Sequence, residues 1–319
     1  MTTVVPAAGG TDAAVDVSVV IPVHNVETWL DECLVSVQSQ SGVSLQIVCV
    51  DDGSSDRSPA ILKEHAEDDG RILVLTQENA GASVARNAGI RAATGRYVCF
   101  LDSDDYWRLD GLGTLVRRAD ADGLDVLLFD AQAFVEPGVD KELWKKYEHA
   151  YTRSGSYTSV LTGPEMLAAM GAELDYQPSA CLGLMRRQFL LDAALSFHPG
   201  ILYEDNLFTF ALHLAAERVG HEDLPLYARR VRAGSIISSV DDSALQSLVT
   251  NLAEMMSLLE GRQYDPSIAT QIGRVVGSVW WSARRACAQV PPWKRRELSL
   301  SSASAVEQAY FQMLINYSA

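Results

Sequence analysis

The chain has 319 residues, of which 48% are hydrophobic and 21% charged, an ordinary globular balance at a length that favours two domains. Its 26 Lys and Arg against 41 Asp and Glu give a formal net charge of −15, which excludes a general nucleic-acid binder. No Lys or Arg precedes Arg57, and no apolar run is long enough to span a bilayer, so we expect neither a secretory signal nor a membrane span, and a cytoplasmic location. The five cysteines have no Cys-x-x-Cys spacing, which argues against disulfides and zinc.

Taken in chain order, residues 1–16 are small and weakly patterned and predict a disordered tail. Short, apolar, β-branched runs then predict buried strands. They lie at 17–23, 45–50, 71–76, 96–101 and 124–129. Helices separate them, the clearest of which carries Leu30, Cys33, Leu34 and Val37 on one face. This alternation predicts an α/β fold with a mainly parallel sheet and helices on both faces.

The alternation lapses between about 130 and 180, in an aromatic and charged segment that we interpret as an insertion facing the acceptor, and a strand-like pattern returns at 181–187. Beyond residue 240 the patterns are helical, at 242–262, 267–289 and 302–317. We therefore expect one catalytic domain over 17–240 and a C-terminal helical region over 241–319.

Ligands of such sheets bind at the carboxyl ends of the strands, which directs attention to the residues that follow each strand. After the second strand come Asp51 to Asp56, a sequence that also suits a plain loop and helix cap. After the fourth strand come Asp102, Asp104 and Asp105, whose charges repel and raise one another's pKa unless a cation neutralises them. A divalent ion, Mg²⁺ or Mn²⁺, suits these oxygen ligands, and a solvated acidic turn is the alternative.

Four segments together resemble the successive motifs of family 2 glycosyltransferases, which have the GT-A fold of nucleotide-diphospho-sugar transferases. They are VSVVIPVHN, VDDGSSD, ENAGASVARNAGIRAATGRYVCFLDSDD and YEDNLF, and they occur in the family's order and spacing over about 17–235. The resemblance implies transfer of a sugar, usually from a uridine diphosphate donor, to an acceptor hydroxyl with inversion at the anomeric carbon. It does not cover the region after about 240.

The same resemblance implies roles for the donor side. Pro22 corresponds to the segment lining the nucleoside pocket, Asp52 to the acid that bonds the base, and Asn79 and Arg86 to further uridine and diphosphate contacts. A carboxylate can accept the uracil N–H and an arginine fork suits phosphate, although Arg86 also fits a surface helix. Asp102, Ser103 and Asp104 match the family's DxD motif. The resemblance implies that Asp104 coordinates the metal together with Asp102, and that Asp102 also contacts the ribose or the sugar.

On the acceptor side, Glu204 and Asp205 resemble the family's ED motif. We interpret Asp205 as the base that deprotonates the acceptor hydroxyl and Glu204 as its neighbour or a donor contact. Both acids would equally suit the first turn of a helix. Arg232 and Ser235 resemble a loop that closes over the diphosphate, or belong to a solvated edge strand together with Arg229 and Arg230.

Residues 266–296 contain six Lys and Arg and no Asp or Glu, together with Trp280, Trp281 and Trp293. This composition is typical of a helix resting on anionic lipid at the inner face of the membrane. It also suits a helix packed into the core or into a homo-oligomer interface, which we prefer, and on that interpretation we expect the tryptophans to be mainly buried.

The sequence thus predicts a metal-dependent, inverting glycosyltransferase of the hexosyltransferase type. Its partners would be a nucleotide diphosphate sugar, with a UDP-sugar as the preferred candidate, and an acceptor. The acceptor would be a glycan or lipid-linked molecule of the kind used for bacterial surface polysaccharides. One alternative is a catalytically inactive subunit that binds nucleotide sugars. The other, a nucleotidyltransferase, lacks the glycine- and arginine-rich phosphate loop that it should carry after the first strand.

Overall fold

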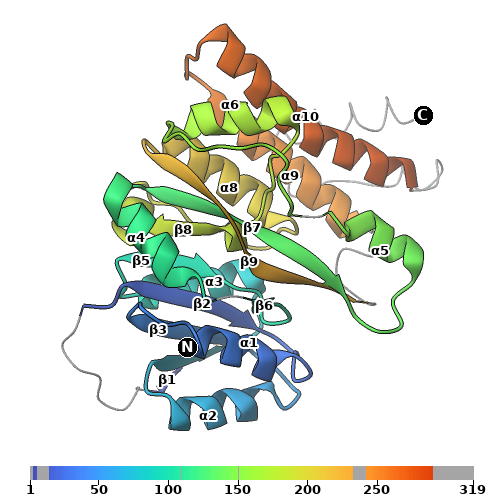
Figure 1. The fold of residues 1–319 in the computed structure, drawn as a ribbon. Helices are drawn as coiled ribbons and strands as arrows, with labels where there is room; N and C mark the ends of the chain where they lie inside the picture. The colour runs from blue at the N-terminus through green and yellow to red at the C-terminus, as the bar shows by residue number, and fades with distance from the viewer. Residues whose placement is uncertain (1–2, 6–13, 109, 150, 233–241, 290–319) are drawn as a thin grey trace.

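The computed structural model describes residues 3–5, 14–108, 110–149, 151–232 and 242–289. Nine strands form one sheet in the order β1-β4-β3-β2-β5-β8-β7-β9-β6 (Figure 1). The strands are β1 (Thr3–Val5), β2 (Val17–Val23), β3 (Leu45–Asp52), β4 (Ile72–Gln77), β5 (Tyr97–Phe100), β6 (Tyr106–Trp107), β7 (Val126–Val135), β8 (Gly183–Arg186) and β9 (Val219–Val231).

The sheet is mixed. Strands β4, β3, β2 and β5 are parallel neighbours, as are β7 and β9, whereas β8 runs antiparallel to both β5 and β7. The predicted parallel order therefore holds over the first half of the chain and is interrupted at β8. The central strand β2 is a run of Val and Ile with every residue but Pro22 buried, as expected for a strand covered on both faces.

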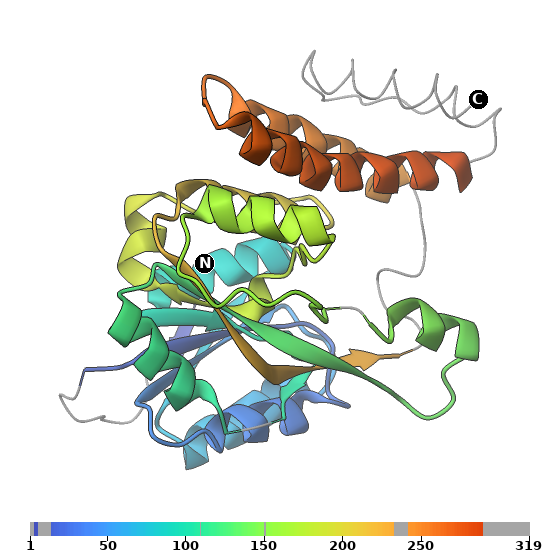
Figure 2. The ribbon, with the colours of Figure 1, turned by 45° about the horizontal axis from the view of Figure 1, so that its top comes forward.

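Helices cover both faces of the sheet (Figure 2). They are α1 (Leu30–Gln38), α2 (Ser58–Asp68), α3 (Ala82–Ala92), α4 (Leu112–Asp122), α5 (Lys141–Tyr147), α6 (Gly163–Glu173), α7 (Arg187–Asp192), α8 (Glu204–Ala215), α9 (Asp242–Leu259) and α10 (Pro266–Gln289), with a 3₁₀ turn at Ala180–Leu182. Helices α1, α2 and α4 lie on one face, and α3, α6 and α8 on the other.

Close packing of α3 on the sheet depends on one glycine. A Cβ added to Gly89 would lie 2.2 Å from Val20 Cγ1, which is far inside van der Waals contact. The absence of a side chain at this position lets α3 approach β2 and β3, and this brings Arg86 on the same helix to the edge of the sheet where β5 ends.

None of the described residues of α9 and α10 belongs to the hydrophobic cluster around the sheet. Leu248, Leu252, Val275 and Val279 pack with Leu167 of α6 and other apolar residues of α8 in a second hydrophobic cluster. The region predicted to be helical is thus helical over both described segments, and it rests on α6 and α8. The third helix predicted there, at 302–317, lies outside the described residues.

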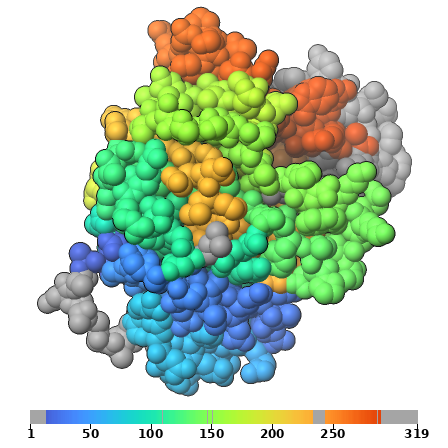
Figure 3. All heavy atoms as spheres, viewed as in Figure 1, coloured from blue at the N-terminus to red at the C-terminus, as the bar shows by residue number. Residues whose placement is uncertain are grey.

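Three features of the fold depart from the sequence prediction. Within the segment predicted to be a disordered tail, Thr3–Val5 form β1, antiparallel to β4. The segment 130–180 begins with a continuation of β7 to Val135 and then carries α5 and α6. The longest strand, β9, was predicted only as a possible edge strand at Arg229 and Arg230, and part of it reaches the surface (Figure 3), where Asp223 and Pro225 are exposed.

Candidate active site

The carboxyl ends of β2, β3 and β4 bring together the predicted nucleoside contacts. The Asp52 carboxylate, at the end of β3, accepts the backbone N–H groups of Ala80 at 2.9 Å and Gly81 at 2.8 Å, and the Gln77 amide at 2.8 Å. It thereby fixes the loop between β4 and α3. Gly53 is required here because its φ is +70° and an added Cβ would meet the backbone nitrogen of Asn79 at 2.9 Å.

His24 and Asn79 continue this polar surface. His24 Nδ1 lies 2.9 Å from the Asp52 backbone oxygen, and its Nε2 lies 3.2 Å from the Asn79 side-chain nitrogen. Both side chains are exposed, and Pro22 is half-buried beside them at the end of β2. Asp52, Asn79 and Pro22 are therefore at one edge of the sheet, as the motif order implies, and their binding of a nucleoside stays a prediction.

The DxD acids follow β5 at the same edge. The side chains of Asp102 and Asp104 are 37% and 29% exposed, and Ser103 between them is buried. Arg232 donates to Asp104 Oδ2 from Nε at 3.0 Å and from Nη2 at 2.7 Å, and its guanidinium stacks 4.4 Å from the Trp29 ring. Arg232 is thus at the site in the predicted place, whereas Ser235 lies outside the described residues.

The third acid of this run, Asp105, is buried. Burial raises the pKa of its carboxyl group, and the charges of Asp104 and Asp102 raise it further, in the direction expected from repulsion. The Tyr227 hydroxyl and the Arg230 backbone N–H donate to it. Asp105 therefore ties the DxD turn to β9, and its role is structural.

The interpretation of Arg230 as a solvated edge-strand residue is wrong, because its side chain is buried. Its side chain is only 4% exposed and forms ion pairs with Glu32 and Glu136, while its Nε donates to the Asp104 backbone oxygen at 2.7 Å. Sequence analysis missed these contacts because it treated Arg229 and Arg230 alike as solvated edge-strand residues, although successive side chains of a strand lie on opposite faces.

Arg86 joins the DxD acids to the ED acids. Its guanidinium is 5% exposed and donates to Asp102 Oδ1 at 2.7 Å and to Glu204 Oε1 at 2.5 Å, and it stacks on Phe197 at 5.2 Å. Both terminal nitrogens are thus engaged by carboxylates rather than open to a phosphate. The alternative of a surface helix arginine is excluded and the contacts favour a positioning role, while the expected uridine or diphosphate contact stays a prediction.

Asp205 is a second buried acid of the site whose pKa is raised. It lies in the first turn of α8, after Tyr203 in the left-handed region at φ 58°, so the helix-start reading of these acids also holds. Burial raises the pKa of Asp205 to about 7; Arg86 opposes this shift, and Glu204 and Asp102 add to it. Within the described part of the chain, its buried Oδ1 has no hydrogen-bond partner. A carboxylate with one oxygen free of hydrogen bonds and a pKa near neutrality has the properties of a general base.

Asp102 and Asp104 fit a divalent cation. Among the described residues, no three His, Cys, Asp or Glu side chains are arranged as a metal site. Mg²⁺ and Mn²⁺ sites of nucleotide enzymes commonly use one or two carboxylates and complete their coordination with substrate phosphates and water. Each of the two carboxylates has one oxygen engaged by an arginine, and both are partly exposed, so the donor set is sufficient for such an ion.

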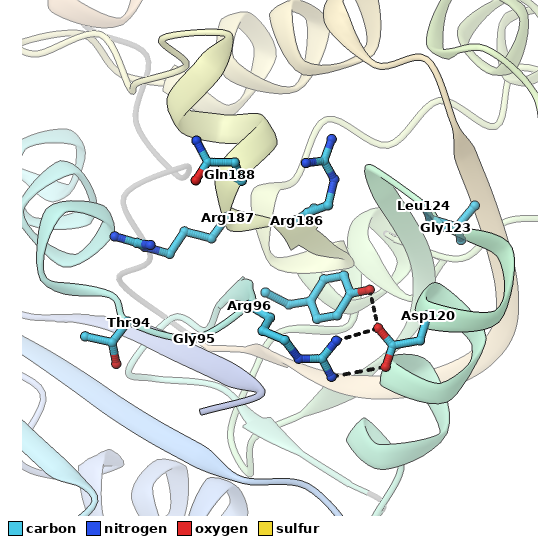
Figure 4. A pocket seen from close by; sticks show the side chains of 10 residues that line it. Thr94, Gly95, Arg96, Asp120, Gly123, Leu124, Arg186, Arg187 and Gln188 are labelled. Atoms are coloured by element: carbon cyan, nitrogen blue, oxygen red, sulfur yellow. Dashed lines mark hydrogen bonds and ion pairs between the residues drawn. The ribbon is translucent and has the colours of Figure 1, made fainter. Parts of the chain in front are cut away.

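The cavity drawn in Figure 4 is a separate feature. Its lining includes Arg96, Asp120, Arg186 and Arg187, and it lies where β5 begins and β8 ends, opposite the end of β5 that carries the DxD acids. Arg96 is held there by Asp120. No residue predicted for donor or acceptor binding lines this cavity, so it does not bear on the site.

The expectation that the tryptophans of the basic segment are mainly buried holds only in part for α10. Trp280 packs against the second hydrophobic cluster, but Trp281 is 54% exposed, so the expectation of burial is wrong for Trp281. Its exposure follows from the helix period, because Arg274, Ser278, Trp281 and Arg285 form one outward stripe. Trp293 lies outside the described residues.

Comparison with known proteins agrees with the fold and the motifs. The model of the family "Glycosyl transferase family 2" matches residues 18–184. Glycosyltransferase GlyA of Streptococcus pneumoniae is 31% identical over 255 residues, which are 78% of this chain and 35% of GlyA, so the chain spans about a third of that relative's length. The chain therefore belongs to the family 2 glycosyltransferases.

Two solved structures support the GT-A fold. TarS 1–349 of S. aureus, in complex with UDP-GlcNAc, superposes with a TM-score of 0.60 at 21% identity, covering 94% of this chain and 90% of that one. The mannosyltransferase PcManGT of Pyrobaculum calidifontis, in complex with GDP-Man and Mn²⁺, gives 0.58 at 16% identity, covering 98% and 90%. The mixed sheet with helices on both sides is thus the fold of this chain and of these two enzymes.

Proposed function

We propose that this chain transfers a sugar from a nucleotide diphosphate sugar to a hydroxyl of a glycan or lipid-linked acceptor, with inversion at the anomeric carbon. A UDP-sugar is the preferred candidate donor. The observation that carries the proposal is Asp205, a buried carboxylate with a raised pKa and one oxygen without a hydrogen bond, whose neighbour Glu204 is linked through Arg86 to Asp102. The UDP-GlcNAc in the TarS complex and the GDP-Man in the PcManGT complex support a nucleotide-sugar donor.

Two groups of residues bind the donor, one its nucleoside and the other its diphosphate. The nucleoside lies over Pro22, Asp52 and Asn79, where Asp52 keeps the β4–α3 loop in place. Asp102 and Asp104 would hold a Mg²⁺ or Mn²⁺ ion, which when bound neutralises charge on the diphosphate leaving group. Arg232 adds a positive charge beside Asp104, and Ser235 follows it in the chain. These residues favour departure of the nucleoside diphosphate because they stabilise the charge that develops on it.

The acceptor reaction is a single displacement. Asp205 accepts the proton of the acceptor hydroxyl at Oδ1 while that hydroxyl oxygen forms a bond to the anomeric carbon and the bond to the diphosphate breaks. Arg86 acts as a positioning residue, because it fixes Asp102 of the donor side and Glu204, the neighbour of the base, in one buried ion-pair network. The intact network disfavours the alternative of an inactive binding subunit.

The donor proposal is tested with the full chain and a panel of UDP-sugars and GDP-sugars, each with Mg²⁺, Mn²⁺ or excess chelator, by following release of the nucleoside diphosphate. We expect metal-dependent release of UDP from at least one UDP-sugar, through slow hydrolysis even without an acceptor. Metal-dependent binding of a donor without any release would support the inactive-subunit alternative instead. Absence of both binding and release across the panel would contradict the proposal.

The location of the protein is a further part of the proposal. Of the helices that the structure describes, none is both long and apolar enough to cross a membrane. We propose that α10 serves packing first, since Trp280 joins the second hydrophobic cluster, and that the chain acts in the cytoplasm. Sedimentation with anionic vesicles tests this: we expect none at low salt, and salt-sensitive sedimentation would show that the basic segment 266–296 binds lipid.

A further inference from the structure

Arg229, on β9, is held between two aromatic rings from the segment that follows β7. Its guanidinium carbon lies 5.0 Å from the centre of the Tyr147 ring and 4.5 Å from that of Tyr151. Backbone contacts fix this arrangement, because Arg229 pairs with Ala133 of β7 and the Ala131 N–H donates to the Tyr151 carbonyl oxygen at 3.4 Å. The aromatic faces hold the cation and leave the N–H donors in its plane for another partner.

Arg229 differs from the neighbouring arginines Arg230 and Arg232, whose charges are neutralised by carboxylates. Arg230 pairs with Glu32 and Glu136, and Arg232 pairs with Asp104. Over the described ranges, no Asp or Glu forms an ion pair with Arg229, although its side chain is only partly exposed. A cation that aromatic rings position without an acid is suited to bind an anion from outside the chain.

Tyr151, which stacks on Arg229, lies within electrostatic range of the proposed base. Burial raises the pKa of the Tyr151 hydroxyl, Arg229 lowers it, and the Asp205 and Asp102 carboxylates raise it further, so these groups share one electrostatic neighbourhood. Tyr151 also has φ at +68°, a backbone conformation that costs energy in a residue other than glycine and is frequent at ligand sites. Both tyrosines come from the segment predicted to face the acceptor.

We propose that Arg229 binds an anionic group of the acceptor, a carboxylate or a phosphate, and so orients the acceptor hydroxyl toward Asp205. This inference rests on the proposed glycosyl transfer and adds to it the charge of the acceptor. A bidentate arginine pair discriminates strongly, because a neutral acceptor would leave the partly buried guanidinium without its partner.

The test compares ligands that share one sugar and differ in charge. Methyl glucoside, glucuronate and glucose 6-phosphate are titrated calorimetrically into the full chain saturated with UDP and Mg²⁺. We expect the wild type to bind one or both anionic sugars about 10-fold to 100-fold more tightly than the neutral one, as for a hydrogen bond to a charged group. The two anionic sugars distinguish a carboxylate site from a phosphate site.

Three variants locate the effect. Arg229→Gln should abolish the preference for the anionic sugar, and Arg229→Lys should keep part of it because the charge remains while the planar fork is lost. Arg187→Gln is the matched control, since it removes the same charge in the cavity at the other end of β5 and should keep the full preference. In transfer assays, Arg229→Gln should raise KM for anionic acceptors more than it lowers kcat.

Two results would overturn the inference: equal binding of neutral and anionic sugars by the wild type, or a preference that survives in Arg229→Gln. Weaker binding of UDP by Arg229→Gln, with unchanged selectivity among the sugars, would assign Arg229 to the donor diphosphate and equally overturn it. An Arg229-dependent preference in a chain that releases no nucleotide from any donor would refute the proposed transfer and leave the anion site standing.

Discussion

Replacing Arg86 by Gln should damage both stability and catalysis. The substitution removes the guanidinium that donates to Asp102 at 2.7 Å and to Glu204 at 2.5 Å while it is only 5% exposed. Loss of one partner of a buried ion pair costs about 3–5 kcal/mol, because the remaining charges stay desolvated. Since the Asp102 side chain is 37% exposed and partly screened, we expect the lower end of this range.

A loss of about 3 kcal/mol should lower Tm by roughly 6–12 °C in a domain of 150–250 residues. The matched control is Arg96→Gln, because Arg96 also bridges two acids, Asp16 and Asp120, but is 46% exposed, and such surface pairs contribute about 0–1 kcal/mol each. Calorimetric or fluorescence melting of the two variants measures the difference. Equal melting of Arg86→Gln and the wild type would refute the buried network.

The same variant tests the catalytic role of the network. Arg86 lowers the pKa of Asp205, so its removal moves that pKa upward from about 7 and leaves less ionised base at neutral pH. The acid limb of the pH–rate profile should therefore move to higher pH in Arg86→Gln. If that variant does not fold, Arg86→Lys, which keeps the charge, should show the smaller shift. An unmoved limb in both variants would show that Arg86 does not act on Asp205.

Three further outcomes follow from the site. In the wild type, kcat/KM should rise with pH through about 7 as Asp205 loses its proton, and a flat profile from pH 5.5 to 8.5 would exclude Asp205 as the base. Asp205→Asn should reduce turnover by roughly 10²–10⁴-fold, and survival of turnover within about threefold would contradict the assignment. Burial raises the pKa of Asp205 from its ordinary 3.8 to about 7, so the wild type loses stability as pH rises from about 4 to about 7, and the variant should melt higher than the wild type at pH 8. Asp104→Ala should weaken UDP binding in Mg²⁺ or Mn²⁺ and leave metal-free uridine binding largely intact, as titration of both ligands can measure; equal activity of the wild type in excess chelator would refute metal assistance.

The strands of the first half of the chain were predictable from sequence because each is an apolar run bounded by polar turns. The run at 17–23 is β2 with the predicted bounds. Strand β9 was not predictable in this way, because it carries Glu222, Asp223 and Pro225 and is interrupted where its register with β7 shifts. Only pairing with β7, about 90 residues earlier in the chain, makes this polar segment a strand.

The candidate site was predictable at the level of motifs and not of contacts. The order of motifs predicted roles for Asp102, Asp104 and Asp205, and the edge of the sheet explains why the first two lie near the predicted nucleoside contacts. The link through Arg86 could not be predicted, since it joins residues 118 positions apart, and the family resemblance implied only a uridine or diphosphate contact for this residue. Likewise, the repulsion at Asp105 was predictable, whereas its partners Tyr227 and Arg230 depended on β9, which was predicted only as a possible edge strand.

The stereochemistry of the released sugar tests the proposed single displacement at Asp205 most directly. The full chain is given a UDP-α-sugar with Mg²⁺ or Mn²⁺, and the anomer that forms first, by transfer or by hydrolysis, is assigned by proton NMR before mutarotation. Direct attack by a hydroxyl activated at Asp205 predicts the β-anomer first, at a rate that falls at least 100-fold in Asp205→Asn. Initial formation of the α-anomer, or of the β-anomer at an undiminished rate in Asp205→Asn, would contradict the mechanism.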